Sequence, residues 1–374
     1  MDIKTSTTDY CDKKKSYNYS AENLSILDVF VINPLAEKLV SKLPFEVPAN
    51  IITIISNSFV FLASVIAITA RKTEWPIWIL IPFCIIIYLI GDAADGIQAR
   101  RTKTGSPLGE FCDHFLDTFV SAEIMLCIFM AYGERNLTII AFMLYMSYMT
   151  QMSAFWEKYV THKLHISRFG ASETLLILAL FATAGFIKPV NAFFSQPAGN
   201  LIPFLSNINI TLTEIALLLS AVGATISIIG TFIRTKKISF NFFLYMLLSA
   251  ILSAAAVFVE KDSSFPVPFL RSPFPVVFLT LTFFHVNYSA ALLSAITMKE
   301  KDPIPDLLLT AAMCVTLFFD VHHPVLYTVY FLYIVVWVAI RVSIFVMRNN
   351  KYWYWINPKP SEETKKQEEK TDKS

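Results

Sequence analysis

Long apolar runs alternate with short polar stretches from residue 48 to residue 350. An apolar run of about 20 residues is long enough to cross the hydrocarbon core of a bilayer as a helix. The pattern therefore predicts an all-α, polytopic integral membrane protein with about ten transmembrane helices. The predicted spans lie at about residues 50–70, 76–98, 107–132, 137–160, 171–188, 209–233, 240–259, 272–297, 305–321 and 325–348.

The stretch before the first span has a different pattern. Between Ile26 and Pro44, apolar positions such as Phe30 and Leu35 are mixed with charged ones. A helix with one apolar and one charged face favours the membrane interface. We therefore predict an interfacial amphipathic helix within residues 26–47. Its charged positions are Asp28, Glu37, Lys38 and Lys42.

The two ends of the chain are polar. Residues 1–25 contain no apolar core of a signal peptide, so we expect no cleavable leader there. Residues 351–374 are expected to form a charged, disordered tail. The aromatic residues 352–355 could form a cation–π cage, but their position after the last span favours an interfacial belt. Residues 48–350 are predicted to form a single transmembrane domain.

Composition and charge narrow the class further. The chain has 374 residues, of which 55% are hydrophobic and 16% are charged. These fractions are typical of membrane proteins with several spans rather than of soluble domains. A formal net charge of +2 argues against a nucleic-acid partner.

Loop charges predict the orientation, because cytoplasmic loops carry the excess of Lys and Arg. One set of loops holds Arg100, Arg101, Lys103, Lys158, Lys163, Arg168, Arg234, Lys236, Lys237, Lys299 and Lys301. The opposite set holds Arg71, Lys72, Arg135, Lys188, Lys261 and Arg271. The richer set predicts that both termini lie on the cytoplasmic side. The compartment stays open between an endoplasmic reticulum or Golgi membrane in a eukaryote and the inner membrane in a bacterium.

Four aspartates stand where the second and third predicted spans meet. Asp92 and Asp95 are three positions apart, and Asp113 and Asp117 are four apart, so each pair shares one helix face. Four converging carboxylates would repel one another without a cation. A divalent ion such as Mg²⁺, Mn²⁺ or Ca²⁺ favours oxygen ligands and resolves this conflict. The stretch therefore predicts a metal centre at the cytoplasmic end of these spans.

Three neighbouring residues fit a phosphate bound over such a centre. Gly96 and Gly109 lack a Cβ and allow close approach of a substrate or another backbone. Arg100 offers a planar set of donors for phosphate oxygens. Each residue also has a plain structural explanation, in helix packing or as a cytoplasmic charge. The joint spacing favours the functional interpretation.

Acidic residues inside a membrane span are costly and are functional candidates by default. In the third span, Glu110, Asp113, His114 and Asp117 follow one another at helical spacing. They form one polar stripe on a segment that is otherwise apolar.

The full pattern D-x2-D-G-x2-A-R-x8-G-x3-D-x3-D runs from Asp92 to Asp117. With this pattern the chain resembles the CDP-alcohol phosphotransferases. The strings Gln98–Thr102 and Ser106–Glu110, with His114 directly after the third aspartate, more closely resemble the choline/ethanolamine phosphotransferase branch.

The resemblance implies transfer of a phosphoalcohol from its CDP ester to the hydroxyl of diacylglycerol, with release of CMP. The implied partners are CDP-choline or CDP-ethanolamine, diacylglycerol and the bilayer, and a homodimer is left open. The four aspartates would hold two Mg²⁺ or Mn²⁺ ions. Arg100 would bind a phosphate oxygen, and His114, oriented by Glu110, would take the proton from the lipid hydroxyl.

Weaker similarity reaches two further polar residues. Asn50 follows Pro48 and has the plain interpretation of a helix N-cap, whereas the resemblance implies a contact with the CDP-alcohol. Glu173 is expected as a negative charge at a helix N-terminus, and the resemblance makes it a candidate neighbour of the substrate. His162 and His165 lie in a basic loop and are expected to be solvated.

Two other functions stay open at this point. A phosphatidylglycerol- or phosphatidylinositol-type synthase shares the signature but is usually a shorter, six-span protein. A cation- or proton-coupled transporter also places carboxylates in a membrane, yet it would need them near the midplane with an internal repeat. The chain departs from its branch at Ile97, where Lys is common, and at Phe115 and Leu116, where Gly-Cys is common. Choline and ethanolamine are therefore left equally open as head groups.

Overall fold

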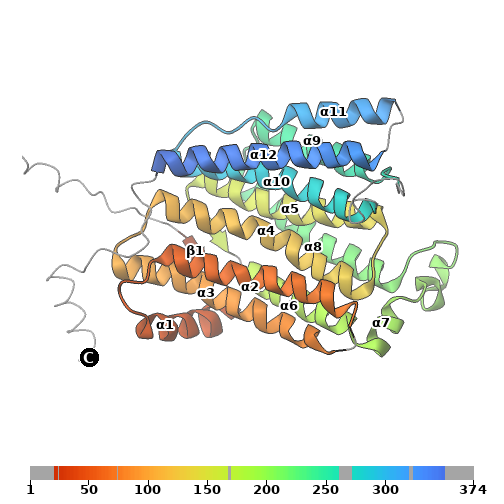
Figure 1. Cartoon of the computed structure of the whole chain (residues 1–374), viewed down its shortest axis with the longest axis horizontal. Coiled ribbons are helices and arrows are strands. Elements are labelled where there is room, and N and C mark those ends of the chain that lie inside the picture. Colours follow the sequence, from red (N-terminus) through yellow and green to blue (C-terminus); the bar gives the residue numbers. More distant parts are fainter. Residues whose placement is uncertain are drawn as a thin grey trace, which may run out of the picture.

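The computed structural model describes residues 21–23, 25–73, 75–166, 170–260, 272–319 and 323–349 and shows a bundle of long helices (Figure 1). The predicted tail and the aromatic residues 352–355 lie outside the described residues. The elements are β1 (Ala21–Asn23), η1 (Asp28–Ile32), α1 (Asn33–Lys42), α2 (Ala49–Ala70), η2 (Ile77–Ile79), α3 (Leu80–Thr102), α4 (Pro107–Tyr132), α5 (Leu137–Thr161), β2 (Leu164–Ile166), α6 (Ala171–Gly185), α7 (Lys188–Phe194), η3 (Ala198–Asn200), η4 (Pro203–Leu205), α8 (Leu212–Thr235), α9 (Phe240–Ala256), α10 (Pro273–Met298), α11 (Leu307–Phe318) and α12 (Pro324–Asn349).

Each predicted apolar run contains at least one helix among the described residues, but fewer than ten helices have the length and composition expected of a membrane span. Within the described residues, six helices are long and apolar enough to cross a membrane. They are α2, η2 with α3, α4, α8, α10 and α12. The pair α6 and α7 would add a seventh span, although its two halves are bent by 103° at the break between them. By length and composition the chain is thus a multi-pass membrane protein, and the count of about ten is not confirmed.

The remaining predicted spans lack either the length or the apolar composition of a membrane-crossing helix. α9 and α11 have only 17 and 12 residues, which is short for a bilayer. α5 has 25 residues, but Ser, Thr, Tyr and Gln side chains interrupt its apolar sequence. The predicted helix over 171–188 stops at Gly185, and α7 restarts at Lys188 with a proline in its first turn.

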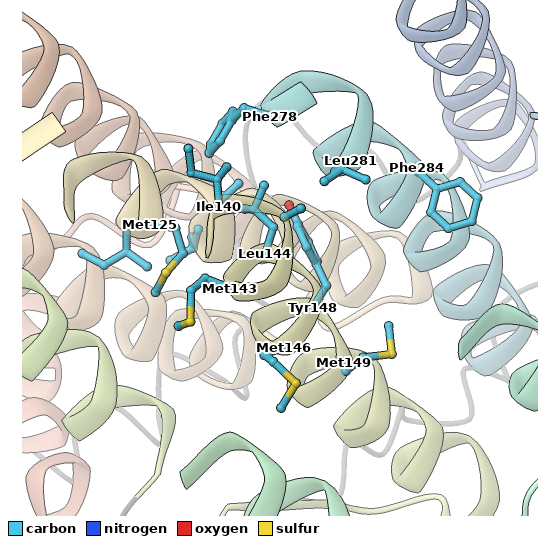
Figure 2. Packing of buried hydrophobic residues seen from close by; sticks show 14 of the residues in the cluster. Met125, Ile140, Met143, Leu144, Met146, Tyr148, Met149, Phe278, Leu281 and Phe284 are labelled. Atoms are coloured by element: carbon cyan, nitrogen blue, oxygen red, sulfur yellow. The ribbon is translucent and has the colours of Figure 1, made fainter. Parts of the chain in front are cut away.

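α4 and α10 occupy the middle of the bundle. α4 packs against α2, α5, α6 and α10, and α10 also packs against α9 and α12. Figure 2 shows this packing where Met143, Tyr148 and Met149 of α5 lie between Met125 of α4 and Phe284 of α10. Lipid tails are as apolar as these side chains, so close packing stabilises the contacts more than removal of water does. Methionine suits such a core because its unbranched side chain fills irregular gaps.

α2 and α3 approach each other closely at a glycine. A Cβ placed on Gly91 would lie 2.4 Å from the Cβ of Ser56, so a larger residue there would push the helices apart. Small residues commonly allow such an approach between membrane helices. The contact fixes the position of α3, which carries the first aspartate pair.

The N-terminal helix exists as η1 followed directly by α1. Ile32, Ala36 and Val40 are buried against the bundle, while Phe30 and Leu35 are exposed. An exposed apolar side suits a membrane surface. The predicted interfacial position itself stays a prediction.

The chain also contains a small amount of strand, which the all-α expectation omitted. β1 pairs in parallel with β2, with Ala21 opposite Leu164 and Asn23 opposite Ile166. The pairing places the segment before η1 next to the segment that follows α5.

Candidate active site

A tight turn brings the end of α3 and the start of α4 to the same end of the bundle (Figure 1). α3 ends at Thr102, and Lys103 follows in the left-handed region with a φ of 55°. α4 begins at Pro107, and the Ser106 hydroxyl accepts a hydrogen bond from the Gly109 amide over 3.1 Å. α2 packs against both helices and closes the space on one side.

The four aspartates lie close enough to interact, as the sequence predicted. Asp92 of α3 lies next to Asp113 of α4. The charges of Asp95 and Asp117 both act on Asp113. Three of the four have half-buried side chains, and Asp95 is buried. The structure therefore gathers four acidic groups from two helices in one site.

Neighbouring side chains hold two of these carboxylates. The Thr53 hydroxyl of α2 donates to Asp95 Oδ2 over 2.5 Å. The Tyr88 hydroxyl of α3 donates to Asp117 Oδ1 over 2.7 Å. Sequence reasoning did not single out either donor, because a hydroxyl in an apolar helix has many equivalent uses.

One carboxylate oxygen in the site has no partner of its own. Oδ1 of Asp113 is buried and accepts no hydrogen bond within the part of the chain that the structure describes. Asp113, His114 and Asp117 also form a compact group whose potential ligand atoms lie within 4.8 Å of one another. A buried, unpartnered oxygen beside further carboxylates fits a divalent cation, which prefers oxygen ligands.

His114 faces a cation rather than solvent. Its Nε2 lies 2.7 Å from Nζ of Lys158, and an ammonium group can only donate hydrogen bonds. This contact favours the tautomer in which Nε2 accepts and Nδ1 carries the proton. Nδ1 points towards Asp113 and Asp117, at 3.7 and 3.8 Å from their Oδ2 atoms. With a proton on Nδ1, His114 is poorly suited to be a metal ligand on that side, whereas the aspartates are well suited.

Lys158 also contacts Glu110, at 2.6 Å from its Oε1. The lysine thus lies between Glu110 and His114. The sequence analysis had predicted that Glu110 orients His114 directly. The assignment of Lys158 to a cytoplasmic loop was wrong, because it belongs to α5 and is only 5% exposed. Its position inside the predicted 137–160 span was the signal that could have identified it, since a charge inside a span is a functional candidate.

Asn50 and Arg100 each lie against one of the two glycines of the motif. Asn50 is not an N-cap as its plain interpretation suggested, because Pro48 occupies that position of α2. Its amide oxygen instead lies opposite Gly109, 3.2 Å from where a Cβ would be. Arg100 is exposed and extends over Gly96, with Nη1 3.4 Å from the corresponding Cβ position.

The neighbouring arginine has a structural role. Arg101 donates from Nη1 to the backbone oxygens of Val40 and Leu43, over 2.8 and 3.0 Å. It therefore holds the end of α1 against α3. Of the two consecutive arginines, Arg100 is an exposed cation, whereas Arg101 connects two helices.

The N-terminal segment brings a further acidic residue towards the site. Asp28 of η1 was predicted among the charges of an interfacial helix, but it is only 8% exposed and its charge acts on Asp92. A single π-helical turn is often found at functional sites. Sequence reasoning missed this residue because η1 reaches the site only through tertiary packing.

Glu173 connects the N-terminal segment to α6. Its Oε1 accepts from the Ser25 hydroxyl and the Leu27 amide, both over 2.8 Å. Its Oε2 accepts from the Gly170 amide, also over 2.8 Å, as expected for an acid at a helix N-terminus. A position of Glu173 next to a bound substrate stays a prediction.

The basic loop near the site has two histidines. His162 is exposed and ends α5 in the left-handed region with a φ of 57°. His165 belongs to β2 and is half-buried. Arg168, which the sequence placed in this loop, lies outside the described residues.

Part of the chain, including the region that carries the four aspartates, is similar to known proteins. Residues 46–198 match the family model for CDP-alcohol phosphatidyltransferase. The chain is 28% identical over 194 residues to cholinephosphotransferase 1 of Saccharomyces cerevisiae, covering 49% of each chain. It is 26% identical over 195 residues to ethanolaminephosphotransferase 1 of Homo sapiens, covering 46% of this chain and 49% of the relative. It is 30% identical over 201 residues to choline/ethanolaminephosphotransferase 2 of Arabidopsis thaliana, covering 51% of this chain and 50% of the relative. These matches span about half the length of each relative.

Proposed function

We propose that this protein transfers phosphocholine or phosphoethanolamine from the CDP-alcohol to diacylglycerol, releasing CMP and forming phosphatidylcholine or phosphatidylethanolamine. The observation that carries the proposal is the group of four carboxylates from α3 and α4 inside the matched domain. The names of the relatives support the choice of head group, because choline and ethanolamine both occur among them. We assign the catalytic domain to residues 48–350 and the site to the cytoplasmic side.

Asp92, Asp95, Asp113 and Asp117 would hold two Mg²⁺ or Mn²⁺ ions. When bound, such ions neutralise the diphosphate and stabilise the charge that develops on the departing CMP. Arg100 is exposed and is proposed to bind a phosphate oxygen through its planar donors.

The nucleotide ester is proposed to bind over Gly96, Gly109 and Asn50. The absence of a Cβ on Gly109 lets the amide oxygen of Asn50 approach the backbone of α4. Asn50 offers both a donor and an acceptor to that ligand.

His114 is proposed to take the proton of the lipid hydroxyl at Nε2, the nitrogen that faces Lys158. The lipid oxygen then forms a bond to the phosphorus of the phosphoalcohol group, while the bond from that phosphorus to the CMP oxygen breaks. The electron pair of the broken bond leaves with CMP. Asp113 and Asp117 face Nδ1–H and would stabilise the imidazolium that forms.

The test is transfer by the purified full chain in lipid-containing micelles. Diacylglycerol and Mg²⁺ are supplied with CDP-choline, CDP-ethanolamine or CDP-diacylglycerol plus a soluble alcohol, and both CMP release and the product lipid are measured. We expect transfer from one or both of the first two donors. Activity only with CDP-diacylglycerol and a soluble alcohol would contradict the head-group assignment. It would still agree with a metal-dependent transferase.

A further inference from the structure

A polar cluster lies between α10, α11 and α12, in segments that are otherwise apolar. Arg341 of α12 donates from Nε to Oδ1 of Asn287 on α10 over 2.8 Å. The Tyr333 hydroxyl, two turns earlier on α12, donates to Oδ2 of Asp306 over 3.1 Å. Asp306 directly precedes α11, and its charge acts on Arg341. All four residues lie outside the range that matches the family model.

Arg341 stands at a costly position for a charge. It lies within a candidate membrane span, more than two turns from either end of α12. A charged residue inside a span is a functional candidate by default. Its Nε is bonded, but within the described part of the chain Nη1 and Nη2 donate no hydrogen bond and form no ion pair. The guanidinium therefore has donors left for a ligand.

An open apolar groove continues from the cluster along α12. It has a volume of about 350 Å³ and is lined by Val329, Leu332, Tyr333, Val336 and Trp337. Arg341 follows Trp337 by four residues, so it stands on the same face of the helix, one turn beyond the groove. From that end the groove extends for about 12 Å along the helix axis, which suits one acyl chain of a lipid.

Two contacts relate the cluster to the candidate active site. The Thr118 hydroxyl, next to the last aspartate of the motif, lies 2.7 Å from that of Ser289 on α10. Asn287 precedes Ser289 by two residues, a rise of about 3 Å along α10. One turn beyond the arginine, Phe345 stacks on Phe111 of α4 with ring centroids 3.9 Å apart. The cluster thus lies close to the depth of the acidic stripe, and its helix contacts the helix that carries the stripe.

The groups at the polar end of the groove favour a neutral lipid. The guanidinium needs hydrogen-bond acceptors, whereas the Asp306 carboxylate has lone pairs beyond those used by Tyr333 and the Leu309 amide. A diacylglycerol provides ester carbonyls as acceptors and one hydroxyl as a donor. Asp306 would repel the phosphate of a phospholipid, and a sterol has no carbonyl for Arg341.

We propose that this groove is a binding site for diacylglycerol outside the metal centre. Arg341 donates to the ester carbonyls, Asp306 accepts from the hydroxyl, and one acyl chain follows the groove. The inference rests on the proposed function, because the site would hold the acceptor lipid beside the catalytic helices. It assigns a role to the C-terminal helices, which the family model does not cover.

Photolabelling tests the site without turnover. The purified full chain in micelles, with EDTA and no CDP-alcohol, is irradiated with a diacylglycerol that carries a diazirine in one acyl chain. We expect label on residues 329–337, identified by mass spectrometry of the peptides. Excess unlabelled diacylglycerol should prevent the labelling, whereas equal amounts of phosphatidylcholine or cholesterol should not. Equal competition by either of these lipids, or no label in the groove, would overturn the proposal.

Two variants examine the polar end of the groove. Arg341→Met removes the donors, and Asp306→Asn removes the charge but keeps a side chain that can cap α11. Each should lower labelling of the groove by about tenfold at subsaturating probe, because a hydrogen bond to a charged group is lost. Arg348→Met is the matched control on the same helix. Arg348 pairs with Glu300 over 3.1 Å at the exposed end of α12, so labelling should not change. Unchanged labelling in both site variants would refute the assignment.

A double variant separates binding from folding. Arg341→Met leaves the buried Oδ1 of Asn287 without its donor, which can destabilise the bundle. Arg341→Met with Asn287→Leu removes both partners, and replacing both is often nearly neutral. We expect this variant to match the unmodified protein in gel filtration and thermal unfolding and still to lose the label. Recovery of labelling would show that Arg341 has only a structural role.

Kinetics connect the site to transfer. In Arg341→Met, KM for diacylglycerol should rise about tenfold, while kcat and KM for the CDP-alcohol stay within about twofold. An unchanged KM for diacylglycerol, or a change confined to the CDP-alcohol, would contradict a role in supplying the acceptor. Absence of transfer by the unmodified protein would instead refute the proposed function, since the labelling does not depend on activity.

Discussion

The two halves of α4 are buried by different means. Pro107 to Phe119 carries the acidic stripe, and its polar groups are enclosed because they contact one another and Lys158. Val120 to Tyr132 has Glu123 as its one charged residue and is enclosed by apolar side chains of neighbouring helices. The first half of α4 thus carries the polar groups of the candidate site, and the second half packs mainly against apolar side chains.

The difference shows where a substitution should have its effect. In the first half, position and charge matter more than volume, because each polar group is matched to a particular partner. In the second half, volume matters more, because protein interiors are closely packed. Substitutions in the first half of α4 should therefore affect mainly activity, and substitutions in the second half should affect mainly stability.

The largest effect is expected at Asp113, the acid with the unpartnered oxygen. Asp113→Asn removes a charged ligand and should lower turnover by several orders of magnitude. EDTA should abolish the activity of the unmodified protein, and added Mg²⁺ or Mn²⁺ should restore it. CMP release measures both effects. Glu214→Gln, which changes a buried acid at the start of α8, serves as a control. Turnover within a few-fold after chelation or in Asp113→Asn would refute the metal centre.

The next largest effect is expected at His114. His114→Ala should lower kcat by about 10²–10⁴-fold, the range typical of a general base. Binding of the CDP-alcohol should persist, because Arg100 and the aspartates are unchanged. Equilibrium binding and kcat are measured on the same preparation. A variant that loses affinity but keeps its rate at saturation would make His114 a binding residue, with Asp117 as the next candidate base.

In the apolar half, Phe129→Ala should affect stability rather than chemistry. Phe129 is fully buried and meets Phe274 edge to face, with ring centroids 6.3 Å apart. The cavity should lower the free energy of unfolding by about 3–5 kcal/mol, while turnover per folded molecule stays within about twofold. Denaturation in mixed micelles gives the stability. Phe61→Ala, at a residue 63% exposed on α2, is the control and should change little. Loss of turnover in folded Phe129→Ala would mean that the two halves are coupled.

The smallest effect is expected at Thr118, on the boundary between the halves. Its hydroxyl lies 2.7 Å from that of Ser289 on α10, and both residues are buried. Hydrogen bonds between membrane helices are worth about 0.6 kcal/mol on average, so Thr118→Ala should cost about that much. A double-mutant cycle with Ser289→Ala measures the interaction. A coupling above about 2 kcal/mol would show that this contact also helps to hold the site.

The apolar runs, the class of protein and the acidic stripe could all be predicted from sequence patterns. These features are local, because a helix repeats every 3.6 residues and therefore places Asp113, His114 and Asp117 together wherever it packs. The spacing of Asp92 and Asp95 was informative for the same reason. A short connection of four residues then left little choice about which ends of the two helices meet.

The groups that complete the site could not be predicted from sequence patterns, because helix packing brings them together. Lys158, Asp28 and Thr53 reach it from three other elements, and no periodicity along the chain indicates that these elements meet there. The candidate spans also could not all be read from the sequence, because the chain bends between α6 and α7 where a continuous helix was predicted. A buried charge is stable only beside its partner, and the partner is chosen by helix packing rather than by local sequence.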